Sequence, residues 1–209
     1  MKFIKIAKKM RNKILQVFYC KKKIKGKNNV IHCNSDVWMK YCSFIINGDN
    51  NRVEIGKKCC FTGLRILIEG NGCSIIFGDN VIVNASKTQP TVINAINDNI
   101  TIGKSCLFSN NIEIHTSDYH GIYDKNGDRI NNEKIITIGN HCWIGLGSKI
   151  LKGTAIPSNS IVGAGSLLTK SFEEENTIIA GVPAKIVKRA VFWDHGRKAH
   201  IDIDYSEEL

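Results

Sequence analysis

The sequence predicts an all-β fold, a solenoid of short parallel strands, and three regularities in residues 102–168 predict it. Nine of the twelve residues taken at every sixth position are bulky and apolar, namely Ile102, Phe108, Ile114, Ile138, Ile144, Ile150, Ile156, Val162 and Leu168. The residue two positions earlier is small in most units: Cys106, Cys142, Ser148, Thr154, Ser160 and Ser166. A glycine often follows the apolar residue, as at Gly103, Gly139, Gly145 and Gly163. A helix would repeat near 3.6 residues and an ordinary strand near 2, so neither explains this pattern.

A repeat of six residues is explained if each unit is one short strand and a turn, and three units close a triangular coil. The aliphatic residue then points inward and the small residue fits the corner. Because one coil cannot bury its own interior, coils must stack. Residues 30–175 supply about seven coils, a prism roughly 30–35 Å tall at about 4.8 Å between stacked strands.

The segment before the repeats, residues 1–29, carries eleven Lys/Arg and no Asp or Glu. The rest has 18 basic and 19 acidic residues, so the net charge of +10 belongs to this arm and nucleic-acid binding by the body is not supported. Residues 3–19 predict an amphipathic helix. Three interpretations stay open for the arm: a solvated or subunit-packing helix, contact with anionic lipid or a membrane-bound assembly, and attraction of an acidic glycan.

The eight cysteines contain no CxxC pair and no zinc-type Cys/His spacing, so reduced thiols packed in a core are expected. The sequence has no apolar run long enough to span a membrane and no signal-peptide pattern. We therefore expect a cytoplasmic protein, with the arm as a possible contact to the inner face of the membrane.

The six-residue series is interrupted once, at His120, Asn126 and Asn132. Residues 116–135 are polar and rich in turn signals, and the tip at 125–128 reads Lys-Asn-Gly-Asp. We expect this segment to leave the solenoid as a protruding loop, and residues 176–209 to form a C-terminal extension.

Three later motifs, WIG (143–145), VGAGSLLTK (162–170) and AGVPAKIVKR (180–189), carry a family resemblance. Residues 136–189 closely resemble the hexapeptide-repeat acyltransferases, whose fold is a left-handed parallel β-helix. Within that family, HTSDYH (115–120) with the following IYD is more similar to the bacterial sialic-acid and polysialic-acid O-acetyltransferases than to the maltose or galactoside enzymes.

The resemblance implies acetyl-CoA as the donor and a homotrimer with active sites between neighbouring prisms. It implies that His120 is the catalytic histidine and that Trp143 lies beside the active site. The coenzyme-binding residues that it implies are Gly145, Ala164, Thr169, Lys170, Lys185 and Lys188. Relatives often have Arg at the last two positions, and several have a small residue where this chain has Leu146.

Acetyl transfer to a hydroxyl requires a base for the hydroxyl proton, stabilisation of an oxyanion, and alignment of the two substrates. A neutral imidazole suits the first task, so His120 is expected to act as general base and then as proton donor to the thiolate. Asp118 or a backbone carbonyl would orient its ring, and the Trp143 indole or a backbone N–H would face the oxyanion. His115 should point outward, and with Asn97 it is a candidate contact to the acceptor.

The sequence therefore predicts an acetyl-CoA-dependent O-acetyltransferase acting on a surface glycan by direct transfer, with no metal. An antibiotic acetyltransferase is the main alternative. A hexapeptide-type zinc carbonic anhydrase would use histidines five residues apart, as His115 and His120 are, but its third ligand is missing near Asp79. A non-enzymatic scaffold is the remaining alternative, and a serine acetyltransferase would carry a histidine that this loop lacks.

Overall fold

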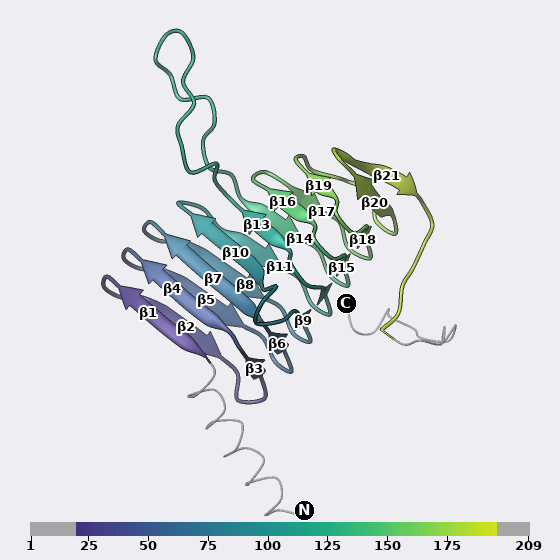
Figure 1. Ribbon diagram of the computed structural model, residues 1–209, viewed down its shortest axis with the longest axis horizontal. Coiled ribbons are helices and arrows are strands. Elements are labelled where there is room, and N and C mark those ends of the chain that lie inside the picture. The colour runs from purple at the N-terminus through teal and green to yellow at the C-terminus, as the bar shows by residue number, and fades with distance from the viewer. Residues whose placement is uncertain (1–19, 196–209) are drawn as a thin grey trace, which may run out of the picture.

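The computed structural model describes residues 20–195, which wind into a prism of stacked triangular coils, a parallel β-helix (Figure 1). Each side of the triangle is a sheet, and strands of successive coils pair in parallel register, as Ile100 does with Ile136. The number of coils agrees with the seven expected from the repeat, since seven strands stack in one of the sheets. Within residues 20–195 there is no helix of the length and hydropathy that crossing a membrane requires.

The three sheets differ in length. The seven-stranded sheet contains β1 (Lys21–Lys25), β4 (Ser43–Asn47), β7 (Leu64–Glu69), β10 (Thr91–Ile96), β13 (Glu113–His115), β16 (Lys149–Leu151) and β19 (Leu167–Leu168). The six-stranded sheet contains β2 (Val30–Cys33), β5 (Arg52–Ile55), β8 (Ser74–Phe77), β11 (Ile100–Ile102), β14 (Ile136–Ile138) and β17 (Ala155–Ile156). The eight-stranded sheet contains β3 (Trp38–Lys40), β6 (Cys60–Thr62), β9 (Ile82–Asn84), β12 (Leu107–Phe108), β15 (Trp143–Ile144), β18 (Ile161–Val162), β20 (Ile178–Gly181) and β21 (Ala184–Lys188).

The core is the column of inward-pointing residues that the six-residue series predicts. All nine apolar members of the series are at most 2% exposed, and the six small residues that precede them are buried as well. The three interrupting residues, His120, Asn126 and Asn132, are exposed in the loop. All eight cysteines are free thiols, five of them buried.

At the corners, side chains of one coil accept hydrogen bonds from backbone N–H groups of the neighbouring coil. Asp49 accepts a hydrogen bond from the backbone N–H of Lys27 at 2.6 Å, and Asn71 accepts one from the N–H of Asp49 at 2.7 Å. These contacts link three consecutive coils at one corner.

The β-helix begins at an earlier residue than the sequence predicted. β1 lies at 21–25, inside the segment assigned to the N-terminal arm, and pairs with β4 along its whole length. The boundary at residue 30 was wrong because KKKIK is exposed at every position and so lacks the alternation of a half-buried strand. The amphipathic helix expected over 3–19 lies outside the described residues.

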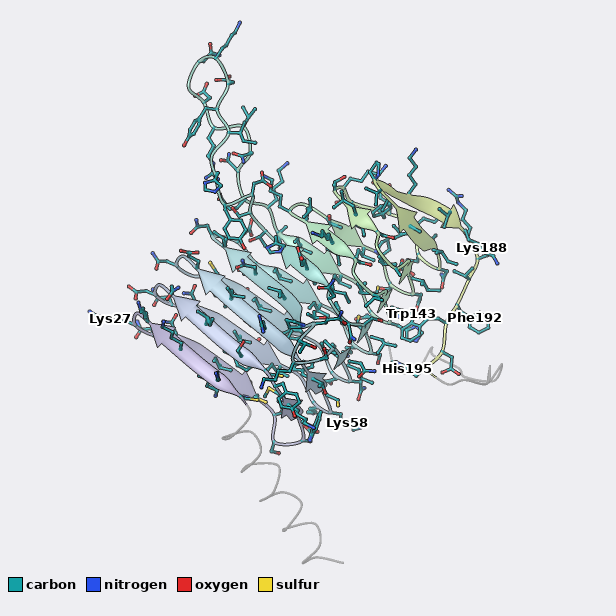
Figure 2. The ribbon with its side chains drawn as sticks, viewed as in Figure 1. Lys27, Lys58, Trp143, Lys188, Phe192 and His195 are labelled. Atoms are coloured by element: carbon teal, nitrogen blue, oxygen red, sulfur yellow. The ribbon has the colours of Figure 1, made fainter. Side chains whose placement is uncertain are left out.

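The C-terminal extension begins as part of the helix. β20 pairs in parallel with β18, and β21 turns back antiparallel to β20 and ends the sheet. The chain then continues beside the prism to His195 (Figure 2). The residues that follow, from 196 to 209, lie outside the described part.

Residues 116–135 leave the helix between β13 and β14 and project far from the body (Figure 1). The projection is a narrow hairpin whose two sides meet in a bridge between Tyr123 and Arg129. Asp124 closes its tip by accepting hydrogen bonds from the N–H groups of Asn126 and Asp128, at 2.8 and 3.0 Å.

Candidate functional site

An open pocket of about 640 Å³ lies where the loop leaves the prism. Its walls are Glu69, Ile96, Asn97, Tyr119, His120, Gly121, Tyr123, Arg129 and Glu133. Glu69 and Ile96 end β7 and β10, so the seven-stranded sheet supplies one wall and the loop the other. The sequence candidates His120 and Asn97 therefore share one pocket, and both are exposed to solvent there.

His115 stands at the base of the loop with its side chain facing outward, as expected from the buried Ile114 before it. Its Nδ1 lies 3.3 Å from the hydroxyl of Tyr119, which also hydrogen-bonds the amide of Asn94. Burial lowers the pKa of His115, and the neighbouring Glu113 carboxylate, 3.7 Å from Nε2, partly opposes that effect. At neutral pH the imidazole is therefore uncharged and can accept or donate a hydrogen bond.

The Asp118 carboxylate binds two side chains that hold the loop. Its Oδ2 accepts hydrogen bonds from Lys152 Nζ and, at 2.8 Å, from Asn131 Nδ2. The hydrogen bond from Lys152 lowers the pKa of Asp118, which keeps the carboxylate ionised. Among the described residues the ring of His120 is not one of its partners, so the expected role of Asp118 in orienting that ring stays a prediction.

A second charged pair forms the far wall of the pocket. Arg129 binds Glu133 with two hydrogen bonds of 2.8 and 3.2 Å, and Ser117 donates to the same carboxylate at 3.1 Å. The hydrogen bond from Arg129 lowers the pKa of Glu133. Because the guanidinium is already matched by a carboxylate, this wall is polar without being strongly cationic.

The other candidates lie on a different part of the prism. Trp143 is on β15 in the eight-stranded sheet, 39% exposed, and Figure 2 shows it beside the C-terminal segment, away from the loop. Gly145 and Ala164 stack in consecutive coils at the next corner. A Cβ atom on Gly145 would lie 2.7 Å from the backbone nitrogen of Ala164, so this corner has room only for hydrogen.

Thr169 and Lys170 follow β19, while Lys185 and Lys188 lie on β21, so all four are in the last coils of the prism. Their side chains are exposed to solvent. Lys188 lies at the end of the molecule farthest from β1 (Figure 2). Within a single chain, His120, His115, Asp118 and Asn97 therefore lie together at the loop. Trp143, Gly145, Ala164 and the lysines of the last coils lie elsewhere on the prism.

Sequence reasoning missed five polar residues around the pocket, Tyr119, Arg129, Asn131, Glu133 and Lys152. Four of them lie in the loop, where no periodicity identifies inward positions. Lys152 lies in a turn after β16 and meets Asp118, 34 positions away in sequence. Within residues 20–195, no three His, Cys, Asp or Glu side chains gather closely enough to hold a metal ion.

Comparison with known proteins gives the family. The polysialic acid O-acetyltransferase of Neisseria meningitidis is 35% identical over 200 residues, which cover 87% of this chain and 92% of that protein. The crystal structure of the polysialic acid O-acetyltransferase OatWY is 33% identical, with a TM-score of 0.67 over 90% of this chain and 96% of that one. The polySia-specific acetyltransferase NeuO superposes with a TM-score of 0.69 at 27% identity, over 91% of each chain.

No protein-family model matches the sequence. The similarity in sequence and structure nevertheless covers nearly the whole chain, and it confirms the expected left-handed parallel β-helix. The chain belongs to the hexapeptide-repeat acyltransferases, and is an acyltransferase of the group that contains the polysialic acid O-acetyltransferases.

Proposed function

We propose that this enzyme transfers an acetyl group from acetyl-CoA to a hydroxyl of a surface glycan, with His120 as the general base. The observation that carries the proposal is the place of His120: it lines an open polar pocket where residues 116–135 leave the helix between β13 and β14. The names of the relatives, polysialic acid O-acetyltransferases, support an acidic glycan or a related glycan as the acceptor.

In the proposed reaction, His120 accepts the proton of the acceptor hydroxyl as its oxygen attacks the carbonyl carbon of the thioester. A C–O bond forms, the C–S bond breaks, and the imidazolium returns the proton to the leaving sulfur. His120 is exposed in the pocket, so an acceptor can reach the ring directly. No covalent acyl-enzyme is needed, and the thiols of Cys106 and Cys142 are buried, so a substrate cannot reach them as nucleophiles.

The protein would act as a homotrimer. The outward-facing residues at one register position of the eight-stranded sheet form an apolar row, Trp38, Cys60, Ile82, Leu107, Trp143, Ile161 and Ile178. The outward residues of the six-stranded sheet are mostly polar, for example Arg52, Glu54 and Thr101. Trp143 is exposed and the other six residues are half-buried, and a contiguous apolar row on the surface supports packing against another copy. Such packing would bring Trp143 of one copy near the loop of its neighbour.

The last coils fit the chemistry of a coenzyme that carries phosphates. Lys170, Lys185 and Lys188 present three exposed ammonium groups, and ammonium groups bind phosphate as point charges. Ala164 is exposed at its corner, so the pantetheine arm could lie along the coil there, while Gly145 is buried and would let the two coils pack closely beneath it. Acetyl-CoA would supply the activated acetyl group and the thiolate leaving group.

The enzyme is proposed to work in the cytoplasm, with residues 1–29 as a possible contact to the inner face of the membrane. The four lysines of β1, Lys21, Lys22, Lys23 and Lys25, are exposed and would add to the charge of the arm. Co-sedimentation with anionic liposomes, for the full chain and for a variant lacking residues 1–19, tests the contact. Equal partitioning of the two would reject a role for those residues.

The reaction is tested by release of free CoA thiol from acetyl-CoA with a panel of polysialic acid, neutral polysaccharides, monosaccharides and acetyl-accepting antibiotics. We expect turnover with a glycan that His120→Ala lowers at least 100-fold. Turnover with antibiotics alone would favour the alternative acceptor class. Turnover that survives the loss of His120 would reject the general base, and no thiol release with any acceptor would reject the reaction. Sedimentation of the wild type and of Leu107→Glu tests the trimer.

A further inference from the structure

A polar cluster formed by Asn131, Asp118 and Lys152 helps to fasten the loop that carries His120 to the prism. Asp118 lies on the outgoing side of the loop and Asn131 on its returning side, and their side chains meet at 2.8 Å. Lys152 comes from the body of the prism, in the turn after β16. The cluster therefore joins three segments that are far apart in sequence.

The side chain of Asn131 is saturated by backbone and side-chain partners around His120. Its Nδ2 donates to the carbonyl oxygen of His120 at 2.8 Å as well as to Asp118, and its Oδ1 accepts from the N–H of Ile122 at 2.7 Å. The residue is only 8% exposed, in a loop whose other residues are mostly in solvent. Asn131 thus fixes the backbone on both sides of Gly121, which has no side chain to restrict its own conformation.

Lys152, on the prism side of the cluster, binds both Asn131 and Asp118. Its Nζ donates to the carbonyl oxygen of Asn131 at 2.7 Å and to the carboxylate of Asp118. The Lys152 side chain is 16% exposed, so its charge is largely withdrawn from water and is compensated by Asp118. Neither Asn131 nor Lys152 lines the pocket, and both contact the loop segment that carries His120, which does line it.

We propose that Asn131 is a positioning residue for the acetyl transfer, and that Lys152 anchors it, so that together they hold the backbone at His120 and present its imidazole to the pocket. The proposal rests on the proposed function, in which His120 is the base. A base must lie within hydrogen-bonding reach of the proton that it removes, and a displacement of about 1 Å can cost about 100-fold in rate. In this proposal His120 is fixed through its backbone, which Asn131 holds by hydrogen bonds. Asp118 contributes by binding the side chains of Asn131 and Lys152.

The test compares Asn131→Ala with Asn132→Ala, which removes the same side chain from the neighbouring exposed position. We expect Asn131→Ala to lower kcat at least tenfold while the KM for acetyl-CoA stays within twofold of the wild type. The inflection of the pH–rate profile should not move, because the base is displaced and not replaced. Asn132→Ala should behave as the wild type. A kcat within twofold of wild type in Asn131→Ala, or an equal loss in both variants, would overturn the proposal.

Lys152 gives a second test that does not depend on the folding of Asn131→Ala. Lys152→Met removes the donor and Lys152→Arg keeps a charged one, so the first should lower kcat at least fivefold and the second should restore at least half of the activity. Lys125→Met, at the exposed loop tip, controls for loss of charge. Equal activity in Lys152→Met and Lys152→Arg would contradict the anchor. Failure of the proposed function is distinct, because the wild type itself would then release no thiol, and both proposals would fall.

Discussion

The imidazole ring of His141 is stacked on the indole ring of Trp193, with centroids 4.4 Å apart and planes within 8° of parallel. The indole N–H also donates to the carbonyl oxygen of His141 at 2.8 Å. Trp193 is 6% exposed and its ring lies 6.0 Å from that of Trp143. The segment after β21 is thus fixed to the eight-stranded sheet beside the tryptophan that the family resemblance assigns to the active site.

Replacing Trp193 should detach that segment. Trp193→Ala removes a buried ring and a hydrogen bond, and we expect the free energy of unfolding to fall by about 2–4 kcal/mol, as measured by urea denaturation. Phe192→Ala is the matched control, because Phe192 is 64% exposed and its loss should change stability by at most about 0.5 kcal/mol. Similar losses in the two variants would mean that the stack does not hold the segment.

Stability should decrease on acidification from pH 7 to 5. Burial lowers the pKa of both His141 and His115, so the unfolded chain binds protons more readily than the folded one below about pH 6.5. The stability that the neutral rings provide is present above that pH, and is lost by at most about 1.4 kcal/mol per pH unit for each histidine. The lowered pKa values of Asp118 and Glu133 act in a separate window, below about pH 4. A melting temperature that stays flat from pH 8 to 5 would contradict this.

Two glycines with positive φ separate the cost of crowding from the cost of backbone strain. Gly48 has a φ of +119°, and a Cβ there would lie 1.9 Å from the carbonyl oxygen of Gly70 in the next coil. Gly72 has a φ of +69° with nothing within 4 Å of such an atom. We expect Gly72→Ala to cost about 1 kcal/mol.

Gly48→Ala should cost more than about 3 kcal/mol or prevent folding, because neither backbone can yield without breaking the stacking of the coils. Chemical denaturation of both variants measures the difference. Equal costs would mean that the corner can open, and that the narrow spacing of this corner does not depend on glycine.

The core could be predicted because one rule repeats along the chain. Ile114, Ile138 and Leu168 are inward residues of different coils, and each obeys the same spacing. β1 could not be predicted, since its residues are exposed and all but Ile24 are lysines, which leaves no pattern to read. Periodicity reports burial, so it fails where a strand of the prism is not buried.

The sequence identified the part of the candidate site that interrupts the six-residue repeat, and did not identify the rest. His120 stands at a position of the series where an aliphatic residue is expected, and this break identifies the loop. The partners that fix the loop follow no period: Lys152 meets Asn131 from 21 positions away, and nothing in the sequence pairs them. Asp118 is near His120 in the sequence, but the partners of its carboxylate, Lys152 and Asn131, depend on where the chain returns in the folded loop.

A double-mutant cycle decides what Asp118 does. If it serves the loop anchor, Asp118→Asn and Lys152→Met should each lower kcat, and the double variant should be no slower than the worse single variant. If Asp118 orients the ring of His120, the two losses should multiply, and Asp118→Asn alone should shift the inflection of the pH–rate profile. Steady-state rates of thiol release over pH 5.5–9 for the four proteins provide both readouts.

Cys20, at the start of the described chain, should be the most reactive thiol. A hydrogen bond from the thiol of Cys42 lowers the pKa of Cys20 to about 7, whereas burial raises the pKa of the similarly half-buried Cys33. A lowered pKa increases the thiolate fraction of Cys20 near neutral pH, and the thiolate is the reactive form. Iodoacetamide labelling followed by mass spectrometry should therefore modify Cys20 at least tenfold faster than Cys33. Cys42→Ala removes the donor, so it should slow Cys20 to the rate of Cys33, and an unchanged rate would show that the neighbouring coil does not activate this thiol.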